Sequence, residues 1–179
     1  HLLASHPTPP SFDGPEDKNG RRNSDEIAFW ASYIEGGPDS WHTDDAGTSG
    51  GIAGAPFVIV GDLNADPSDN DATDNAIVSL LAHPRVNDTQ PKSLGGPEQA
   101  ELQGQANDAH KGDPALDTSD FIDTVGNLRV DYALPSSDLD VQGSGVFWPA
   151  STDPLFPLVG VFPFPLSDHR AVWVDLKVP

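Results

Sequence analysis

The sequence predicts a mixed α+β fold, and three observations support this prediction. Short apolar runs rich in β-branched residues recur along the chain, as is typical of strands, at residues 57–60, 128–134, 141–148 and 171–176. Two segments, 23–35 and 75–82, instead repeat their apolar residues with the 3.6 period of an amphipathic helix. The 18 Pro and 17 Gly among the 179 residues disfavour a mainly helical architecture and predict long ordered loops.

The chain begins with a short apolar strand, Leu2 to Ser5, which the prolines that follow prevent from continuing in a ladder. His6 is therefore expected at the end of that strand. Residues 11–22 predict a loop. Asn23, followed three residues later by Glu26, matches a capping box, so the first helix is expected to begin there.

The stretch Phe57-Val-Ile-Val-Gly-Asp-Leu-Asn64 predicts a buried strand that carries two polar side chains to its C-terminal end. Because side chains alternate along a strand, Asp62 and Asn64 are expected to point the same way. Residues 69–74 are typical of a helix start, and the helix at 75–82 follows them. Residues 87–120 lack periodicity and predict a long functional or mobile loop.

Further polar residues lie within or beside the later strands: Asp131 in the run at 128–134, and Asp168 with His169 just before the run at 171–176. Carboxylate and carboxamide oxygens suit Mg²⁺, Mn²⁺ or Ca²⁺. A histidine beside a carboxylate suits a general base or a partner for a phosphoryl oxygen. These residue types therefore point to metal-assisted phosphoester hydrolysis.

The composition limits the classes of function. Nine Lys plus Arg against 28 Asp plus Glu give a formal net charge of −19, which weighs against binding nucleic acid by phosphate neutralisation. The absence of Cys excludes disulfides and thiolate chemistry. No apolar stretch approaches the roughly 20 residues that a membrane span needs, so no span is expected. The localisation stays open, with a secreted or cell-surface bacterial protein as the preferred expectation.

Three segments also carry a family resemblance. Gly61-Asp-Leu-Asn64, Arg129-Val-Asp-Tyr132 and Ser167-Asp-His169, in this order and each attached to a strand, resemble motifs of the endonuclease/exonuclease/phosphatase superfamily, which includes deoxyribonuclease I-like nucleases. The resemblance implies a four-layer α/β/β/α sandwich of mainly antiparallel sheets. It also implies hydrolysis of a phosphoester by in-line attack of activated water on phosphorus. The implied cofactor is a divalent cation, Mg²⁺ first, with Mn²⁺ or Ca²⁺ as alternatives.

The resemblance implies a role for each residue of the first and last segments. Asp62 orients or deprotonates the attacking water and is also a candidate metal ligand. Asn64 donates to the phosphate and stabilises its developing charge. Asp168 binds the divalent metal.

The remaining candidates would act on the phosphate or through a neighbour. By resemblance, His169 contacts the scissile phosphate or acts as general base, and Asp131 orients it through the other ring nitrogen. His6 contacts a phosphate oxygen or assists the leaving group. Arg22, one of few basic residues, is a candidate for holding a substrate phosphate, although a salt bridge at the start of the helix accounts for it equally well.

The family pattern also has an N-terminal half with an Asn and a metal-binding Glu, and nothing before His6 holds either. The chain contains no Met. Residues 1–179 are therefore expected to be the C-terminal portion of one domain, mostly its C-terminal half. The missing N-terminal half would then be an obligatory partner of this chain.

Three alternatives accompany these expectations. The acidic run Asp62–Asp71 resembles a calcium loop of the EF-hand type, but Pro67 stands where Gly is required and Thr73 where Glu is required. Asp131 could simply pair with Arg129. The whole domain could be a non-catalytic interaction module on the same fold, although the full set of polar residues argues against this. Nucleic acid and a small phosphoester both remain possible substrates.

Overall fold

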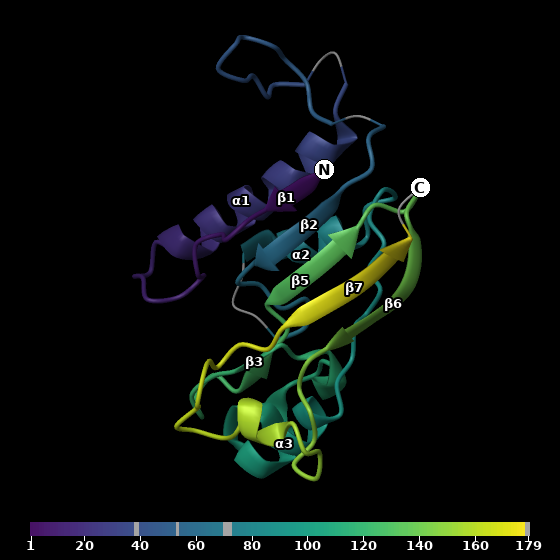
Figure 1. Ribbon diagram of the computed structural model, residues 1–179. Helices are drawn as coiled ribbons and strands as arrows, with labels where there is room; N and C mark the ends of the chain where they lie inside the picture. Colours follow the sequence, from purple (N-terminus) through teal and green to yellow (C-terminus); the bar gives the residue numbers. More distant parts are fainter. Residues whose placement is uncertain (38–39, 53, 70–72, 178–179) are drawn as a thin grey trace. The chain divides into compact units, whose positions relative to one another are not determined.

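The computed structural model describes residues 1–37, 40–52, 54–69 and 73–177 (Figure 1). The chain divides into two compact units. The first comprises residues 1–65, 71–88 and 134–139, and the second comprises residues 66–70, 89–133 and 140–179. Both units contain helices and strands, so the predicted mixed α+β class is confirmed.

The sheet of the first unit is built on a parallel pair. β1 (Leu2–Ala4) lies beside β2 (Val58–Asp62), with Leu2 opposite Val58. The sheet order is β1-β2-β5, and the last residues of β5 (Asp131–Pro135) belong to this unit. The predicted strands at Leu2 to Ser5 and at residues 57–60 are confirmed, and the β1–β2 pair departs from the mainly antiparallel expectation.

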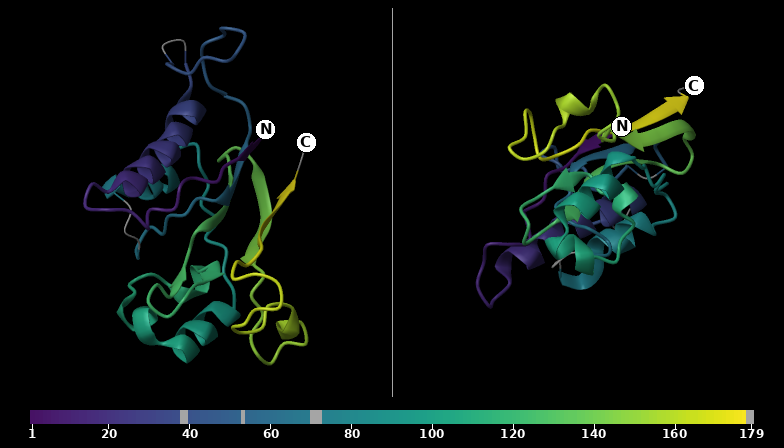
Figure 2. Two further views of the ribbon diagram at one scale, coloured as in Figure 1. Left: turned by 90° about the vertical axis from the view of Figure 1, so that its left-hand side faces the viewer. Right: turned by 90° about the horizontal axis from the view of Figure 1, so that it is seen from below.

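Two helices pack together in the first unit, α1 (Lys18–Glu35) and α2 (Ala76–Leu81). Figures 1 and 2 show α1 running along one face of the β1–β2 pair, with α2 beside it. The apolar period of the sequence explains the packing, because Ile27 and Ile34 of α1 and Ile77 and Leu80 of α2 are all buried.

The start of α1 corrects one prediction. The helix begins at Lys18 and not at Asn23, so residues 18–22 are helical and the proposed capping box is wrong. Asn23 instead lies inside the helix and is fully buried. The 3₁₀ turn η1 (Thr73–Asn75) precedes α2. Of the predicted helix start at 69–74, residues 70–72 lie outside the described residues, as does the end of the acidic run that resembled a calcium loop.

The second unit contains two antiparallel strand pairs. The short strands β3 (Ser119–Asp120) and β4 (Asn127–Leu128) pair with each other. β6 (Asp140–Val146) pairs with β7 (Val172–Lys177), and the two run side by side in Figures 1 and 2. The predicted strand at 128–134 is interrupted, because Arg129 and Val130 separate β4 from β5.

The stretch 87–120 is largely structured, which contradicts the prediction of a long loop. It forms α3 (Gly95–Gln103), the 3₁₀ turns η2 (Gln105–Ala109) and η3 (Pro114–Leu116), and β3. The helix was missed because it opens with Gly-Gly-Pro and has no clear apolar stripe. A further 3₁₀ turn, η4 (Phe156–Leu158), precedes the last strand.

A small apolar core supports the second unit. Val146, Trp148 and Val159 are buried together, with Phe156 and Val172 packed against them. The guanidinium of Arg170 lies over the Trp148 ring at 4.5 Å from its centroid, which ties the residues just before β7 to this core. In the described part of the chain, no helix combines the length and the apolar character that a membrane crossing requires.

Candidate active site residues

A close approach of two strand ends builds the part of the candidate site that lies in the first unit. Gly61 of β2 has a φ of 140°, and a Cβ atom there would lie 1.9 Å from the carbonyl oxygen of Ser5. Only glycine permits this backbone conformation and this contact. The Ser5 N–H donates to the carbonyl of Val60 at 3.0 Å. The residues that follow β1 are thereby held beside the end of β2.

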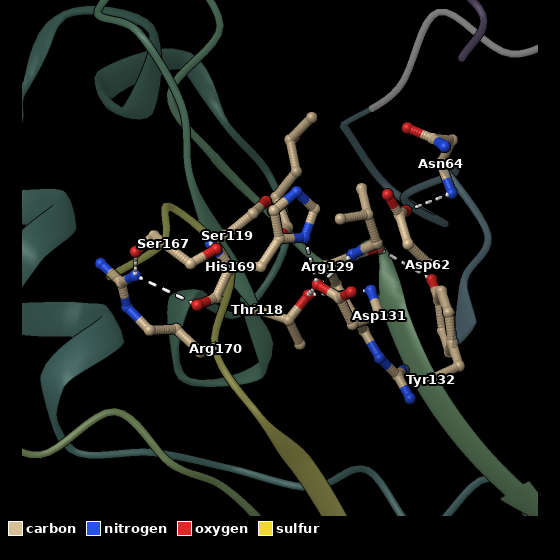
Figure 3. Close-up of polar contacts among 12 residues, drawn as sticks. Asp62, Asn64, Thr118, Ser119, Arg129, Asp131, Tyr132, Ser167, His169 and Arg170 are labelled. Carbon is tan, nitrogen blue, oxygen red and sulfur yellow. Dashed lines mark hydrogen bonds and ion pairs between the residues drawn. The ribbon is translucent and has the colours of Figure 1, made fainter. Parts of the chain in front are cut away.

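This approach brings His6 to Asp62. The His6 Nε2 atom lies 3.4 Å from an Asp62 carboxylate oxygen, and the His6 side chain is 72% exposed while that of Asp62 is 19% exposed. The other Asp62 oxygen accepts the backbone N–H of Asn64 at 2.8 Å, as Figure 3 shows. Asp62 is therefore oriented from both sides, with its imidazole neighbour open to solvent.

Asn64 does not follow the alternation that the sequence predicted. β2 ends at Asp62, and Asn64 has a left-handed φ of 50°, so its side chain is placed by a turn and not by the pleat of a strand. Its side-chain amide donates to the carbonyl of Pro7 at 3.0 Å. The Asn64 side chain thus faces the segment that follows His6, within the same unit.

Asn23 holds this arrangement and was not recognised as part of it from the sequence. Its side-chain amide nitrogen lies 3.0 Å from the carbonyl oxygens of both Thr8 and Leu63, and 3.3 Å from that of Asn64. The two segments that carry His6 and Asn64 are therefore joined by one buried amide. The signal was present, because Asn23 lies on the same helical face as the buried Ile27 and Ile34.

The part of the candidate site in the second unit is a histidine–carboxylate pair. His169 Nδ1 and an oxygen of Asp131 are 2.9 Å apart, and Figure 3 shows this contact. The same Asp131 oxygen accepts the hydroxyl of Thr118 at 2.9 Å. A carboxylate at Nδ1 favours the tautomer in which Nε2 carries the lone pair. The pair that the resemblance implied is therefore present, and the Asp131 carboxylate bonds to His169 and Thr118.

Thr118 is completely buried, and its hydroxyl bonds to the Asp131 carboxylate and to two backbone N–H groups. Besides donating to the carboxylate, its hydroxyl oxygen accepts the backbone N–H groups of Val130 at 3.0 Å and of Asp131 at 2.9 Å. These bonds explain why the strand is interrupted just before Asp131. No pattern in the sequence pointed to Thr118, because it lies in a stretch without periodicity.

Backbone pairing fixes the segment that carries His169. The backbone N–H of Asp120 donates to the carbonyl of Asp168 at 2.8 Å, and that of Arg170 donates to the carbonyl of Thr118 at 2.7 Å. The hydroxyl of Ser167 accepts the backbone N–H of His169 at 3.0 Å. The ring of Phe121 meets the imidazole edge to face, at 5.5 Å between centroids. His169 is thus oriented from several sides.

A buried ion pair lies beneath this segment. The guanidinium of Arg170 is 3.5 Å from an oxygen of Asp120, and both side chains are almost inaccessible to solvent. Burial raises the pKa of Asp120 to about 6, although the positive charge of Arg170 acts in the opposite direction. Burial also lowers the pKa of Arg170. The pair anchors the residues around His169 and does not itself face the solvent.

Two other candidates have clear positions. Asp168 is partly buried, and within the described residues its carboxylate has neither a hydrogen bond nor an ion pair. A carboxylate is a ligand that suits a hard divalent cation. Arg22 is exposed and lies 3.4 Å from Glu26 one helical turn further on. A salt bridge was the alternative interpretation of Arg22 from the sequence, and the structure contains this salt bridge with Glu26.

Comparison with known proteins places the chain in a family. The Endonuclease/Exonuclease/phosphatase family model matches residues 5–169, and the chain therefore belongs to this family. The family is one of phosphoester hydrolases of the nuclease and phosphatase type, and the mixed α+β structure with antiparallel pairs is consistent with its deoxyribonuclease I-like fold. No curated protein and no solved structure matches the chain. The missing N-terminal half stays a prediction, which this match does not support.

Proposed function

We propose that this protein is a metal-dependent phosphoesterase that hydrolyses its substrate by in-line attack of water on phosphorus. The observation that carries the proposal is the 2.9 Å contact between His169 and Asp131, with Thr118 bonded to the same carboxylate oxygen. A positioned imidazole with its second nitrogen basic is the group that proton transfer from water or contact with a phosphoryl oxygen requires. Family membership supplies the phosphoester as the substrate class.

The residues of the second unit would accept the proton of the attacking water or bind the phosphoryl group. His169 Nε2 would accept a proton from water or donate a hydrogen bond to a phosphoryl oxygen, depending on its protonation state. Asp131 would stabilise the imidazolium that forms, because a carboxylate beside Nδ1 lowers the cost of the positive charge. Thr118 would keep the carboxylate in that orientation.

The residues of the first unit would act on the same phosphoester, as the resemblance implies. Asp62 would orient the attacking water with the oxygen that does not accept the Asn64 N–H. His6 is exposed and next to Asp62, so it would contact a phosphate oxygen or assist the leaving group. The Asn64 amide donates one N–H to the Pro7 carbonyl, and its second N–H would be the donor to phosphate.

A divalent cation fits the carboxylates that these segments provide. Asp168 would hold it, because its carboxylate offers hard oxygen ligands and, within the described residues, forms no hydrogen bond or ion pair. By resemblance, Asp62 is the second candidate ligand. The cation would supply charge stabilisation for the phosphoryl oxygens. Mg²⁺ is the preferred ion, with Mn²⁺ and Ca²⁺ as alternatives. A secreted or cell-surface location is a separate proposal.

The test is hydrolysis of a generic phosphodiester and a phosphomonoester, bis(4-nitrophenyl) phosphate and 4-nitrophenyl phosphate, with Mg²⁺ and with EDTA. We expect metal-dependent release of nitrophenolate. His169→Ala should lower the rate by ~10²–10⁴-fold, the range for a general acid or base. Asp168→Asn should raise the Mg²⁺ concentration that gives half-maximal rate. Asp175→Asn, on β7, is the matched control and should leave both quantities unchanged.

Two results would contradict the proposal. Hydrolysis that EDTA does not affect, or that Asp168→Asn leaves with an unchanged metal requirement, would remove the metal from the reaction. Absence of metal-dependent hydrolysis of either ester would favour the non-catalytic interaction module on the same fold.

A further inference from the structure

The first unit contains an open pocket of about 370 Å³, and His6 forms part of its wall. Three aromatic side chains, Phe29, Trp30 and Trp41, line it together with the carboxylates of Asp25 and Glu26. Among the described residues, no Lys or Arg belongs to its lining. This combination of aromatic faces and negative charge beside a candidate catalytic residue is not explained by the hydrolysis of a generic phosphoester.

The aromatic wall is held in place by specific contacts. Phe29 and Trp30 come from α1 and meet edge to face, with ring centroids 5.1 Å apart. Trp41 is 69% exposed, yet its indole N–H donates to the hydroxyl of Ser32 on α1 at 3.2 Å. The Trp30 indole N–H donates to the Ser5 hydroxyl at 2.8 Å. The rings are therefore positioned before any ligand arrives, although an exposed tryptophan is costly to keep in water.

The two carboxylates differ in their availability. Glu26 accepts the backbone N–H of Thr8 at 2.6 Å and is also paired with Arg22, so part of its charge is already used. Asp25 is exposed and, within the described residues, has neither a hydrogen bond nor an ion pair. The pocket thus presents one uncompensated negative charge next to aromatic faces.

Charge and shape select the class of ligand. A phosphate or carboxylate in this pocket would meet the charge of Asp25, which, unlike that of Glu26, no Arg or Lys pairs within the described residues, in a chain of net charge −19. An alkylammonium group instead offers methyl groups to the rings and a positive charge to both the ring faces and the carboxylate. His6, on the wall of this pocket, lies beside Asp62, where the phosphate is proposed to bind.

We propose that the pocket formed by Phe29, Trp30, Trp41 and Asp25 binds an alkylammonium group of the substrate. The preferred substrate is then a zwitterionic phosphoester, with its phosphate at His6 and Asp62 and its cation a few bonds away. This inference rests on the proposed phosphoesterase function. It adds the substrate class, which neither family membership nor the candidate catalytic residues specify.

The test compares two diesters that differ in one atom, the 4-nitrophenyl phosphodiesters of choline and of 3,3-dimethylbutanol. The second replaces the quaternary nitrogen by carbon and so removes only the charge. We expect kcat/KM to be about 10-fold higher for the choline ester, as a partly desolvated cation–π contact with a nearby carboxylate allows. Trp41→Ala and Asp25→Asn should each reduce this ratio to 3-fold or less by the same reasoning. Trp173→Ala and Asp140→Asn, exposed positions in the second unit, are the matched controls.

Binding is measured separately from turnover by titrating the protein with tetramethylammonium chloride against an equal concentration of NaCl. Saturable binding that Trp41→Ala removes and Trp173→Ala retains supports the pocket even where no diester is hydrolysed, so failure of the hydrolase proposal is distinguishable. Equal kcat/KM for the two diesters, or a ratio unchanged in Trp41→Ala and Asp25→Asn, would overturn it. A nucleoside that inhibits hydrolysis of the choline diester more strongly than tetramethylammonium does would also overturn the proposed alkylammonium site. Such a result would indicate that the aromatic rings stack on a nucleobase. The rates of hydrolysis of glycerophosphocholine and of phosphatidylcholine vesicles are then compared. A higher rate with the first indicates a soluble substrate, and a higher rate with the second indicates a lipid.

Discussion

Thr118→Val is the most direct test of how the histidine–carboxylate pair is positioned. Valine is close to threonine in shape but carries a methyl group in place of the hydroxyl, so the substitution removes the hydrogen-bonding group. That hydroxyl donates to Asp131 at 2.9 Å and accepts two backbone N–H groups, those of Val130 and Asp131, at 3.0 and 2.9 Å. Because Thr118 is completely buried, water cannot replace these bonds.

The magnitude follows from the groups left without partners. Each buried N–H without an acceptor costs about 1–3 kcal/mol, and a lost hydrogen bond to a charged group costs about 1.5–3 kcal/mol. The bonds share one oxygen and are not additive, so we expect a loss of about 3–5 kcal/mol in the free energy of unfolding. Catalysis should fall as well, mainly in kcat, because the Asp131 carboxylate loses one of the bonds that orient it toward His169.

The assay is urea unfolding followed by circular dichroism, together with the kinetics of phosphodiester hydrolysis. Thr118→Ser is the matched control, since it keeps the hydroxyl and removes one methyl group. It should cost only about 1 kcal/mol and restore kcat. A Thr118→Val protein within about 1 kcal/mol of the wild type, or one with unchanged kcat, would refute the role assigned to this hydroxyl.

Three further predictions concern other parts of the structure. Gly61→Ala should destabilise the protein by about 2–5 kcal/mol, because the new Cβ collides with the Ser5 carbonyl at a left-handed φ. Asn23→Ala should cost about 2–4 kcal/mol and lower activity, because it leaves the buried carbonyl of Leu63 and the partly buried carbonyls of Thr8 and Asn64 without this donor. Asp117→Asn should stabilise the protein at pH 8 and have little effect at pH 4. Burial, and then repulsion by neighbouring carboxylates, raises the pKa of Asp117 to about 8, so its contribution to stability is complete below pH ~4 and is lost as the pH rises through about 8.

Each of these outcomes has a distinct check. A Gly61→Ala midpoint in urea equal to that of the wild type would mean that the two strand ends can separate without cost. For Asn23, the control is Asn19→Ala in the same helix, which removes one partly buried bond to Ser11 and should cost no more than about 1.5 kcal/mol. For Asp117, the stability of wild type and variant is measured from pH 4 to 8, and parallel curves would contradict the raised pKa.

The local patterns of the sequence predicted the strands well where apolar runs were continuous. The run before Asp62 became β2, and the final apolar run became β7, because a buried strand needs no more than such a run with turn residues at its ends. The capping pattern at Asn23 failed for the opposite reason. Its side chain forms tertiary hydrogen bonds with distant carbonyls, and these outweigh the local preference for a helix start.

By itself, the sequence determined the fold class, the family and the residue types available for chemistry, since these depend on local patterns and on three short ordered motifs. The tertiary structure decided which groups orient the candidate catalytic side chains. Thr118 reaches Asp131 across 13 positions of the chain, and Asn23 reaches Leu63 across 40. Such partners leave no period in the sequence, because a buried hydrogen bond depends on where the backbone folds and not on spacing along the chain.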